Sequence, residues 1–337
     1  MASSSHFITF FILSISVCVK QYLCVEYPVG RCQIMHPVIE LSREEFLKYG
    51  QLADVKHLHN AMQKILIPRV VGTIRHKQVR NYISDNLRKM QWSVEYDTFR
   101  KTVPILKKVQ FHNIIAKLNP DAKRFLVLTC HYDSKYFKYD KFVGAIDGVP
   151  CAMLLNMAHV LQAALEPFRK TELSLMFIFF DGKESIVAES NGLYGARNLA
   201  NSWHADGTLK KLDILVDLDL IGSPNSTFYS FFKNTDEWFN RFIALEERLS
   251  NAKILYRCIN PKRYFGNNPI RSHYQQSDHL PFLKRKVPIL HVTPPRVPSV
   301  WHRKVDVESN IDHDATEDIS RIIRLFIMEY LNSGINK

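Results

Sequence analysis

The chain has 337 residues, 46% of them hydrophobic, and a formal charge of +12. This apolar content can build a substantial core, in one large domain or two modest ones. Lys and Arg are scattered along the whole length with no helix-turn-helix, finger or RNP-like pattern, which sets aside a nucleic-acid-binding role and favours a basic soluble protein.

The N-terminal 25 residues predict the compartment. His6 to Val19 is an apolar run of signal-peptide length, too short to be a good membrane span. We therefore expect residues 1–25 to be a signal peptide and residues 26–337 to be secreted as a single domain, with no membrane span after cleavage. Golgi retention by an uncleaved segment is the alternative. Secretion permits disulfides, and the one N-glycosylation sequon begins at Asn225.

Along the chain, apolar periodicity predicts strands that alternate with helices. A capping box, Ser42 to Glu45, begins a short first helix. The further predicted helices are His57–Ile65, Lys77–Met90, Val149–Leu165, a short helix within Gly192–Ala200, Asp236–Leu249, Asp278–Lys286 and Ala315–Leu331. The predicted strands are Trp92–Phe99, His112–Leu118, Phe125–Thr129, Leu173–Phe180, Leu212–Ile221 and Val287–Val292. This order predicts an α/β three-layer sandwich, with a mostly parallel mixed central sheet flanked by helices.

Acidic residues and imidazoles follow the apolar strands. The run Leu173–Phe180 is apolar throughout, as in a strand buried on both faces, and it leads directly to Glu184. Ligands in open α/β sheets bind beyond the carboxyl ends of the strands. The other members of this set are His131, Asp133, Asp219 and His291 at strand ends, and Asp147 and His302 in two loops. Taken singly, each is more often a capping or turn residue, but together they offer the oxygen and imidazole ligands of a zinc site.

Six motifs that include these residues resemble the glutaminyl cyclases, which share their fold with zinc aminopeptidases. The motifs keep their order over nearly the whole mature chain. They are HYDSKYF from His131, GAIDGVPCAM from Gly144, FFDGKE from Phe179, DLIGSPN from Asp219, DHLPFL from Asp278 and VWH from Val300.

The resemblance implies roles for individual residues. It implies one Zn²⁺ per chain, with Asp147, Glu184 and His302 as its ligands, and a disulfide between Cys130 and Cys151. It further implies that Asp219 assists the leaving amide as a catalytic acid. Implied substrate-binding residues are Trp301 as an aromatic wall, Gln276 as a pocket amide and His291 as an imidazole behind the pocket.

The chain departs from the family pattern at its proton-transfer residues. Lys183 stands where the family has the glutamate that acts as general base, and Ser277 stands where it has an acid. Lys183 could itself be the catalytic base, since burial beside Zn²⁺ would lower its pKa. Alternatively, it forms an ion pair with Asp219 or points to solvent.

Three functions therefore stay open. The first is a zinc-dependent glutaminyl-peptide cyclotransferase, an aminoacyltransferase that converts the N-terminal Gln of peptides and proteins to pyroglutamate with release of ammonia, impaired by the change at Lys183. The second is an inactive zinc-binding paralogue that holds peptide N-termini. The third is a two-zinc aminopeptidase with ligands from His131, Asp147, Glu184, Asp219 and His302. In each case we expect a monomer.

Overall fold

The computed structural model describes residues 24–26, 32–34, 39–138, 141–184, 186, 192–257, 263–271 and 277–334. The chain forms two compact units, Met1–Pro37 and Val38–Lys337. In the first unit, β1 (Cys24–Glu26) pairs antiparallel with β2 (Cys32–Ile34), a hairpin that the sequence did not predict. Most of the predicted signal peptide lies outside the described residues, and its boundary after residue 25 stays a prediction.

The second unit is built on a six-stranded sheet with the order β3-β4-β6-β5-β7-β8. β5, β6, β7 and β8 are mutually parallel, whereas β3 and β4 form a long antiparallel hairpin at one edge. The strands are β3 (Ser93–Val103), β4 (Lys107–Lys117), β5 (Arg124–His131), β6 (Leu173–Phe180), β7 (Leu212–Leu218) and β8 (Ile289–Val292). The predicted mostly parallel mixed sheet is confirmed.

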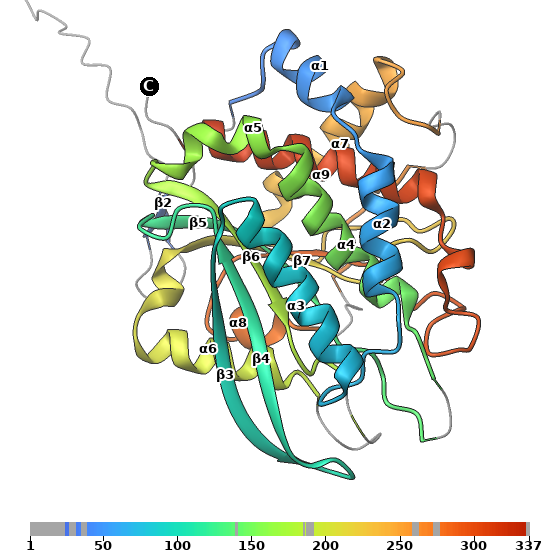
Figure 1. Cartoon of the computed structure of the whole chain (residues 1–337). Helices are drawn as coiled ribbons and strands as arrows, with labels where there is room; N and C mark the ends of the chain where they lie inside the picture. The colour runs from blue at the N-terminus through green and yellow to red at the C-terminus, as the bar shows by residue number, and fades with distance from the viewer. Residues whose placement is uncertain are drawn as a thin grey trace, which may run out of the picture. The chain divides into compact units, whose positions relative to one another are not determined.

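Helices cover both faces of this sheet, as Figure 1 shows for α3 and α4 in front of the strands. One face packs on α2, α3, α4, α7 and α9, and the other packs on α6 and α8. The helices are α1 (Arg43–Gln51), α2 (Val55–Ile65), α3 (Ile74–Lys89), α4 (Ala145–Val160), α5 (Gln162–Leu165), α6 (Tyr194–Ala205), α7 (Asp236–Asn251), α8 (Leu280–Leu283) and α9 (His313–Ser333). Short 3₁₀ turns, η1 to η4, occupy Glu166–Arg169, Thr208–Lys211, Lys233–Thr235 and Glu308–Asn310. The predicted three-layer α/β sandwich is therefore confirmed.

Local side-chain caps explain the starts of four of the nine described α-helices. The predicted capping box forms at α1, where Ser42 Oγ accepts the Glu45 N–H at 3.2 Å and Glu45 Oε2 accepts the Ser42 N–H at 3.1 Å. Three further helices begin with a single side-chain cap. The side chains of Asp54, Thr73 and Asp312, which precede α2, α3 and α9 respectively, each accept the backbone N–H of the residue three positions further along the chain. Such caps satisfy donors that the first helical turn leaves unpaired.

Two helix predictions need correction. The helix predicted from Val149 begins four residues earlier, at Ala145, so Asp147 lies in its first turn and not in a loop. This start escaped prediction because Gly144 supplies no side-chain cap. The helix predicted over Asp278–Lys286 is a single turn, α8, followed by tight turns that lead into β8.

Within the described residues, no single helix has both the length and the apolarity to cross a membrane. Among the helix pairs in these same residues, α4 together with Gln162–Arg169 meets those criteria, and the pair is bent by 71°. α4 is buried in the core of the second unit from Ala145 to Ala158, which accounts for its apolar composition.

Candidate metal centre and neighbouring residues

The three predicted metal ligands come from separate elements and meet at one end of the sheet. Glu184 follows β6 after a tight turn, Asp147 projects from the first turn of α4, and His302 lies in the loop after β8. The turn after β6 requires Gly182, whose φ is +70° and where an added Cβ would lie 2.5 Å from the Phe111 ring. This local geometry delivers Glu184 to the centre.

The ligand atoms converge closely. Glu184 Oε2 lies 3.2 Å from His302 Nε2, and ligand atoms of His131, Asp147 and Glu184 lie within 4.8 Å of one another. In the described part of the chain, neither Asp147 oxygen nor His302 Nε2 has a hydrogen-bond partner. Since buried polar atoms are nearly always paired, these atoms are suited to a cation. Two carboxylates and an imidazole are a donor set that Zn²⁺ accepts.

The pKa values of the two carboxyl groups, Asp147 and Glu184, are shifted in opposite directions. Burial raises the pKa of Asp147 well above its usual range, and the neighbouring Glu184 and Asp219 charges raise it further. Burial would also raise the pKa of Glu184, but His302 and Lys183 more than offset this and lower it. A divalent cation between the carboxylates would relieve their repulsion, which makes the centre fit the metal that the sequence predicted.

Two charged residues that sequence reasoning missed position Asp147. Arg69, which is fully buried, donates to the carbonyl oxygens of Val143 at 2.5 Å and Gly144 at 3.0 Å. Asp306 accepts the Ile146 N–H at 3.0 Å and so caps α4 from 160 residues away in the chain. Because both contacts join distant segments, no local pattern could have revealed them.

Asp133, which the sequence indicated only as one of the strand-end acids, orders the turn that carries Glu184. Its two oxygens accept the backbone N–H groups of Lys183 at 3.1 Å and Glu184 at 3.0 Å. The same carboxylate lies 3.3 Å from His131 Nδ1. Burial would raise the pKa of Asp133, but His131 and the Glu184 N–H lower it strongly. Asp133 follows β5 directly, and its position at a strand end was the only signal for this role.

Lys183 takes the second of the alternatives predicted from sequence, an ion pair with Asp219. Its ammonium lies 2.6 Å from each Asp219 oxygen and 3.2 Å from His131 Nε2. Burial lowers the pKa of Lys183, but Asp219 above all, then Asp147 and Glu184, raise it above its usual range. These three carboxylates thus oppose the lowered pKa that a lysine base needs.

Asp219 has further partners besides Lys183. The Ser277 hydroxyl donates to Asp219 Oδ2 at 3.0 Å. Burial raises the pKa of Asp219, but Lys183, His131 and Ser277 together lower it below its usual range. Asp219 is thus held as a carboxylate with both oxygens engaged.

The predicted substrate-binding residues lie in different environments. Trp301 is half-buried and stacks on His302, with ring centroids 3.7 Å apart, so it lies beside the centre. His291 is buried in contact with Asp217 and His279, and these three residues are a second group of possible metal ligands. Burial lowers the pKa of His291 well below its usual range. Gln276 lies outside the described residues.

The predicted disulfide partners are adjacent in the core. Cys130 ends β5 and Cys151 lies in α4, and their Sγ atoms are 2.6 Å apart. The structure holds them as free thiols, with Cys151 also donating to the His131 carbonyl oxygen at 3.0 Å. The disulfide stays a prediction, with its two sulfurs side by side.

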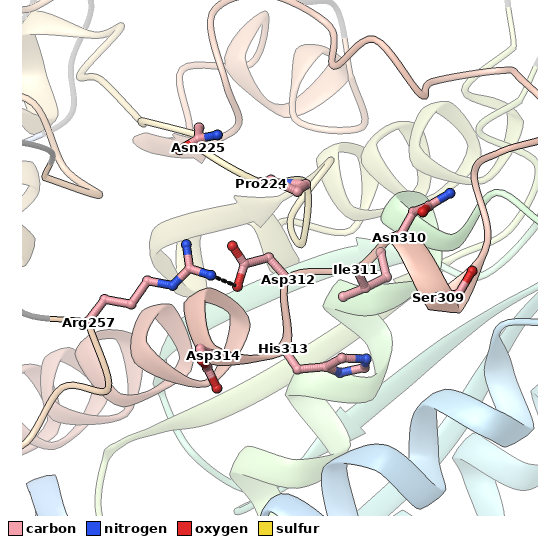
Figure 2. Close-up of a pocket in the computed structure, with 9 residues that line it drawn as sticks. All are labelled: Pro224, Asn225, Arg257, Ser309, Asn310, Ile311, Asp312, His313 and Asp314. Carbon is pink, nitrogen blue, oxygen red and sulfur yellow. Dashed lines mark hydrogen bonds and ion pairs between the residues drawn. The ribbon is translucent and has the colours of Figure 1, made fainter.

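The predicted glycosylation site, Asn225, lies apart from the predicted metal ligands. Asn225 is exposed on a turn, at the rim of an open depression of about 610 Å³ (Figure 2). Arg257 and Asp312 form an ion pair of 2.7 Å in this depression. None of the predicted metal ligands lines it. The depression is therefore distinct from the metal centre.

Comparisons with known proteins show the family to which the chain belongs. A sequence profile described as "Peptidase family M28" matches residues 113–327. A protein of Drosophila melanogaster named glutaminyl-peptide cyclotransferase is 48% identical over 325 residues, which cover 91% of this chain and 92% of the relative. The chain belongs to the glutaminyl-peptide cyclotransferase group of peptidase family M28.

Further relatives support this membership. A glutaminyl-peptide cyclotransferase of Bothrops jararaca is 42% identical over 82% of this chain and 81% of its own length. The crystal structure of Macrostomum lignano glutaminyl cyclase superposes with a TM-score of 0.81 at 34% identity, covering 88% of this chain and 96% of that one. The resemblance predicted from the sequence motifs, and the fold it implied, are both confirmed.

Proposed function

We propose that this cyclotransferase-family chain converts the N-terminal Gln of peptides and proteins to pyroglutamate, releasing ammonia, at a rate reduced by Lys183. The observation that carries this proposal is that Glu184 lies close to both Asp147 and His302, and that both oxygens of Asp147 and Nε2 of His302 are buried without a hydrogen-bond partner among the described residues. One Zn²⁺ held by these side chains would act as a Lewis acid toward the substrate's γ-amide carbonyl.

The protein side chains would mainly orient the substrate. Trp301, stacked on His302, offers an aromatic wall beside the metal ligands. A substrate that already carries both reacting groups needs only to be held with its α-amine near its own γ-amide carbon. This orientation accelerates the reaction even where proton transfer is poor.

Proton transfer is the weak step at this centre. The α-ammonium must lose a proton before it can attack, and the leaving nitrogen must gain one. Lys183 is a cation engaged by Asp219, and Asp219 has a lowered pKa and holds no proton to give. Loss of a positioned base costs about 10²–10⁴-fold in rate. Turnover is therefore expected to be slow.

A second function is favoured by this same ion pair. If Lys183 and Ser277 abolish proton transfer altogether, the chain is an inactive zinc-binding paralogue that holds peptide N-termini. The aminopeptidase alternative is less favoured. It needs two metal ions and a carboxylate base, whereas Lys183 takes the position of the base and contacts both His131 and Asp219.

Ammonia release from a Gln-initiated peptide by the zinc-loaded protein tests the proposal. The Lys183→Glu variant should raise kcat by roughly 10²-fold or more, because it supplies a carboxylate base. Lys183→Gln is the matched control, since it removes the charge without adding a base. Slow turnover by the unmodified protein supports the enzyme. No turnover at high protein concentration, with binding of the peptide retained and rescue by Lys183→Glu, supports the paralogue instead.

We also propose that the chain enters the secretory pathway and is released as a monomer, with Golgi retention as the alternative. The apolar segment His6 to Val19, the adjacent Cys130 and Cys151 sulfurs and the exposed Asn225 support entry into the secretory pathway. Protein recovered from the culture medium should begin near residue 26 and lose mass on treatment with an N-glycosidase. An intact N-terminus on cell-associated protein would contradict secretion.

A further inference from the structure

The β3–β4 hairpin extends past the other strands at the end of the sheet where the metal centre lies (Figure 1). β4 pairs antiparallel with β6 at Ile114 and Phe179, and Lys107, where β4 begins, lies seven positions before Ile114. At about 3.3 Å per residue, the hairpin runs roughly 23 Å beyond this pair of residues. It extends in the direction in which β6 leads to Glu184.

The hairpin packs on the segment that carries Glu184. Three of its apolar side chains form one cluster with two side chains that follow β6; the five are Val103, Val109, Phe111, Ile186 and Tyr194. The Tyr194 N–H donates to the Gly182 carbonyl oxygen at 2.9 Å, and Lys101 Nζ lies 5.3 Å from the centroid of the Tyr194 ring. The exposed side chains of the hairpin therefore border the metal centre.

The first turn of α3 belongs to the same border. His76 Nε2 lies 2.9 Å from Oδ1 of Asp181, the residue that directly follows β6. A Cβ added at Gly72 would lie 3.8 Å from Val109 Cγ1, so the start of α3 lies beside the hairpin. The exposed side chains around His76 are thus close to those of the hairpin.

The exposed charges of this border have one sign. In segments 72–78 and 100–108, which are described throughout, every exposed charged residue is Lys or Arg. These residues are Arg75, Lys77, Arg100, Lys101, Lys107 and Lys108. They are scattered in the sequence, but the fold brings them to one end of the sheet.

A second basic border lies on the other side of Glu184. Segment 294–307 carries His302, whose Nε2 is 3.2 Å from Glu184 Oε2. Every exposed charged residue of this described segment is again basic; they are Arg296, Arg303 and Lys304. The acid in this segment, Asp306, is buried and accepts the Ile146 N–H. Cations therefore border the metal centre on two sides.

The opposite end of the sheet differs. There the exposed charges are mixed, since Lys123 before β5 pairs with Glu172 before β6, and Asp206 precedes Lys210 and Lys211 before β7. The unbalanced positive charge is thus a property of the metal centre's surroundings and not of the whole surface.

We propose that the two basic borders bind acidic residues of the substrate, so that the chain prefers Gln-initiated peptides that carry Asp or Glu within about their first seven residues. This inference rests on the proposed function and adds the class of substrate. An extended peptide spans about 3.3–3.6 Å per residue, so seven residues match the length by which the hairpin extends. A peptide is favoured over an anionic lipid surface because the cations border the centre from which a bound chain must emerge.

Gln-initiated peptides of about twelve residues test this preference with the zinc-loaded natural chain. One peptide has three Glu residues from its fourth position, one has Gln at those positions, and one has the three Glu at its far end. At low ionic strength, kcat/KM from ammonia release should be roughly tenfold higher for the first peptide than for the second. Salt at about 0.5 M should reduce this ratio to less than about twofold. Glu at the far end should give less than half the gain.

Charge reversal locates the effect. The triple variant Arg75→Glu, Lys107→Glu, Lys108→Glu should bring the ratio between the first two peptides to about one or below. The matched control is Lys170→Glu, Lys210→Glu, Lys211→Glu, which changes the net charge equally at the starts of β6 and β7. This control should keep the tenfold ratio, and equal losses in the two triple variants would overturn the proposal.

The outcomes separate this inference from the proposed function. Where turnover is slow, the dissociation constants of the same peptides replace kcat/KM, with the same expected ratios. Turnover or binding of Gln-initiated peptides without a preference for Glu in the natural chain would overturn the inference alone. Binding to vesicles that contain phosphatidylserine, with no preference among the peptides, would assign the cations to a lipid surface instead. If the natural chain neither converts nor binds any Gln-initiated peptide, the proposed function fails and this inference with it.

Discussion

The buried ion pair between Lys183 and Asp219 makes a quantitative prediction about stability. In the metal-free protein, Lys183→Met removes the cation while keeping a side chain of similar length. Asp219, Asp147 and Glu184 then remain as buried carboxylates around an apolar group. We expect the variant to fold but to be markedly less stable than the natural chain.

The size of the effect follows from the burial of both partners. The two side chains are 7% and 1% exposed, so solvent screens their interaction little. Removing one partner of such a pair costs about 3–5 kcal/mol, because the other charge is left buried without compensation. For a chain of 337 residues, an unfolding entropy of about 2.1 cal/mol/K per residue converts this into a fall in Tm of roughly 4–7 °C.

Thermal unfolding followed by circular dichroism in the presence of a chelator measures this change. The Lys117–Glu95 pair provides a matched control, since its atoms lie 2.5 Å apart but its side chains are 19% and 52% exposed. Lys117→Met should lower Tm by no more than about 1.5 °C, because exposed pairs contribute about 0–1 kcal/mol. If Lys183→Met proves no more damaging than Lys117→Met, the buried ion pair is not stabilising and the reasoning is refuted.

The pH dependence adds a second check. Lys183 holds the pKa of Asp219 below its usual range, so the stability it confers is present above the unfolded pKa near 4 and is lost as the pH falls through the lowered value. The difference in Tm between the natural chain and Lys183→Met should therefore be full from pH 7 down to about pH 4 and shrink as the pH falls further. A difference that grows on acidification would contradict this assignment.

Three further predictions concern other parts of the second unit. Asp133→Asn should weaken Zn²⁺ binding by about 10–100-fold in a chelator competition, because it disturbs the turn that carries Glu184; unchanged affinity would remove Asp133 from the centre. Burial raises the pKa of Glu246 to about 7, so its carboxyl destabilises the fold as the pH rises from about 4.5 through 7. Glu246→Gln should flatten the fall in Tm between pH 5 and pH 8, and an unaltered slope would refute this. If Cys130 and Cys151 form a disulfide in the secreted protein, mass spectrometry should show a linked peptide pair, and reduction should lower stability by about 3 kcal/mol; two free thiols in that protein would count against the bond.

The strand pattern was the strongest predictor of the fold. Leu173–Phe180 is apolar at every position, and the structure makes it β6 with the same bounds and buries all eight residues. A strand buried on both faces needs no tertiary information to be recognised, because each of its residues must avoid water. The β3–β4 hairpin was predicted too short, since its outer part is exposed and polar and so lacks a burial pattern.

The start of α1 could be read from the sequence because its cap is local. Ser42 and Glu45 lie three residues apart, and their reciprocal hydrogen bonds can be read from the sequence. The start of α4 depends on Arg69 and Asp306, which are distant in the chain, so the position of Asp147 in a helix was missed. A contact between distant segments leaves no periodic trace in either of them.

The sequence by itself determined the composition of the centre, since acids and imidazoles that follow buried strands must gather at one end of a parallel sheet. It also identified Lys183 as a departure from the family pattern. Only the tertiary structure decided which partner Lys183 has, because its long side chain can reach Asp219, the metal ligands or solvent. The packing of β6 beside β5 and of β5 beside β7 brings Lys183, His131 and Asp219 together, and burial then makes their charges pair.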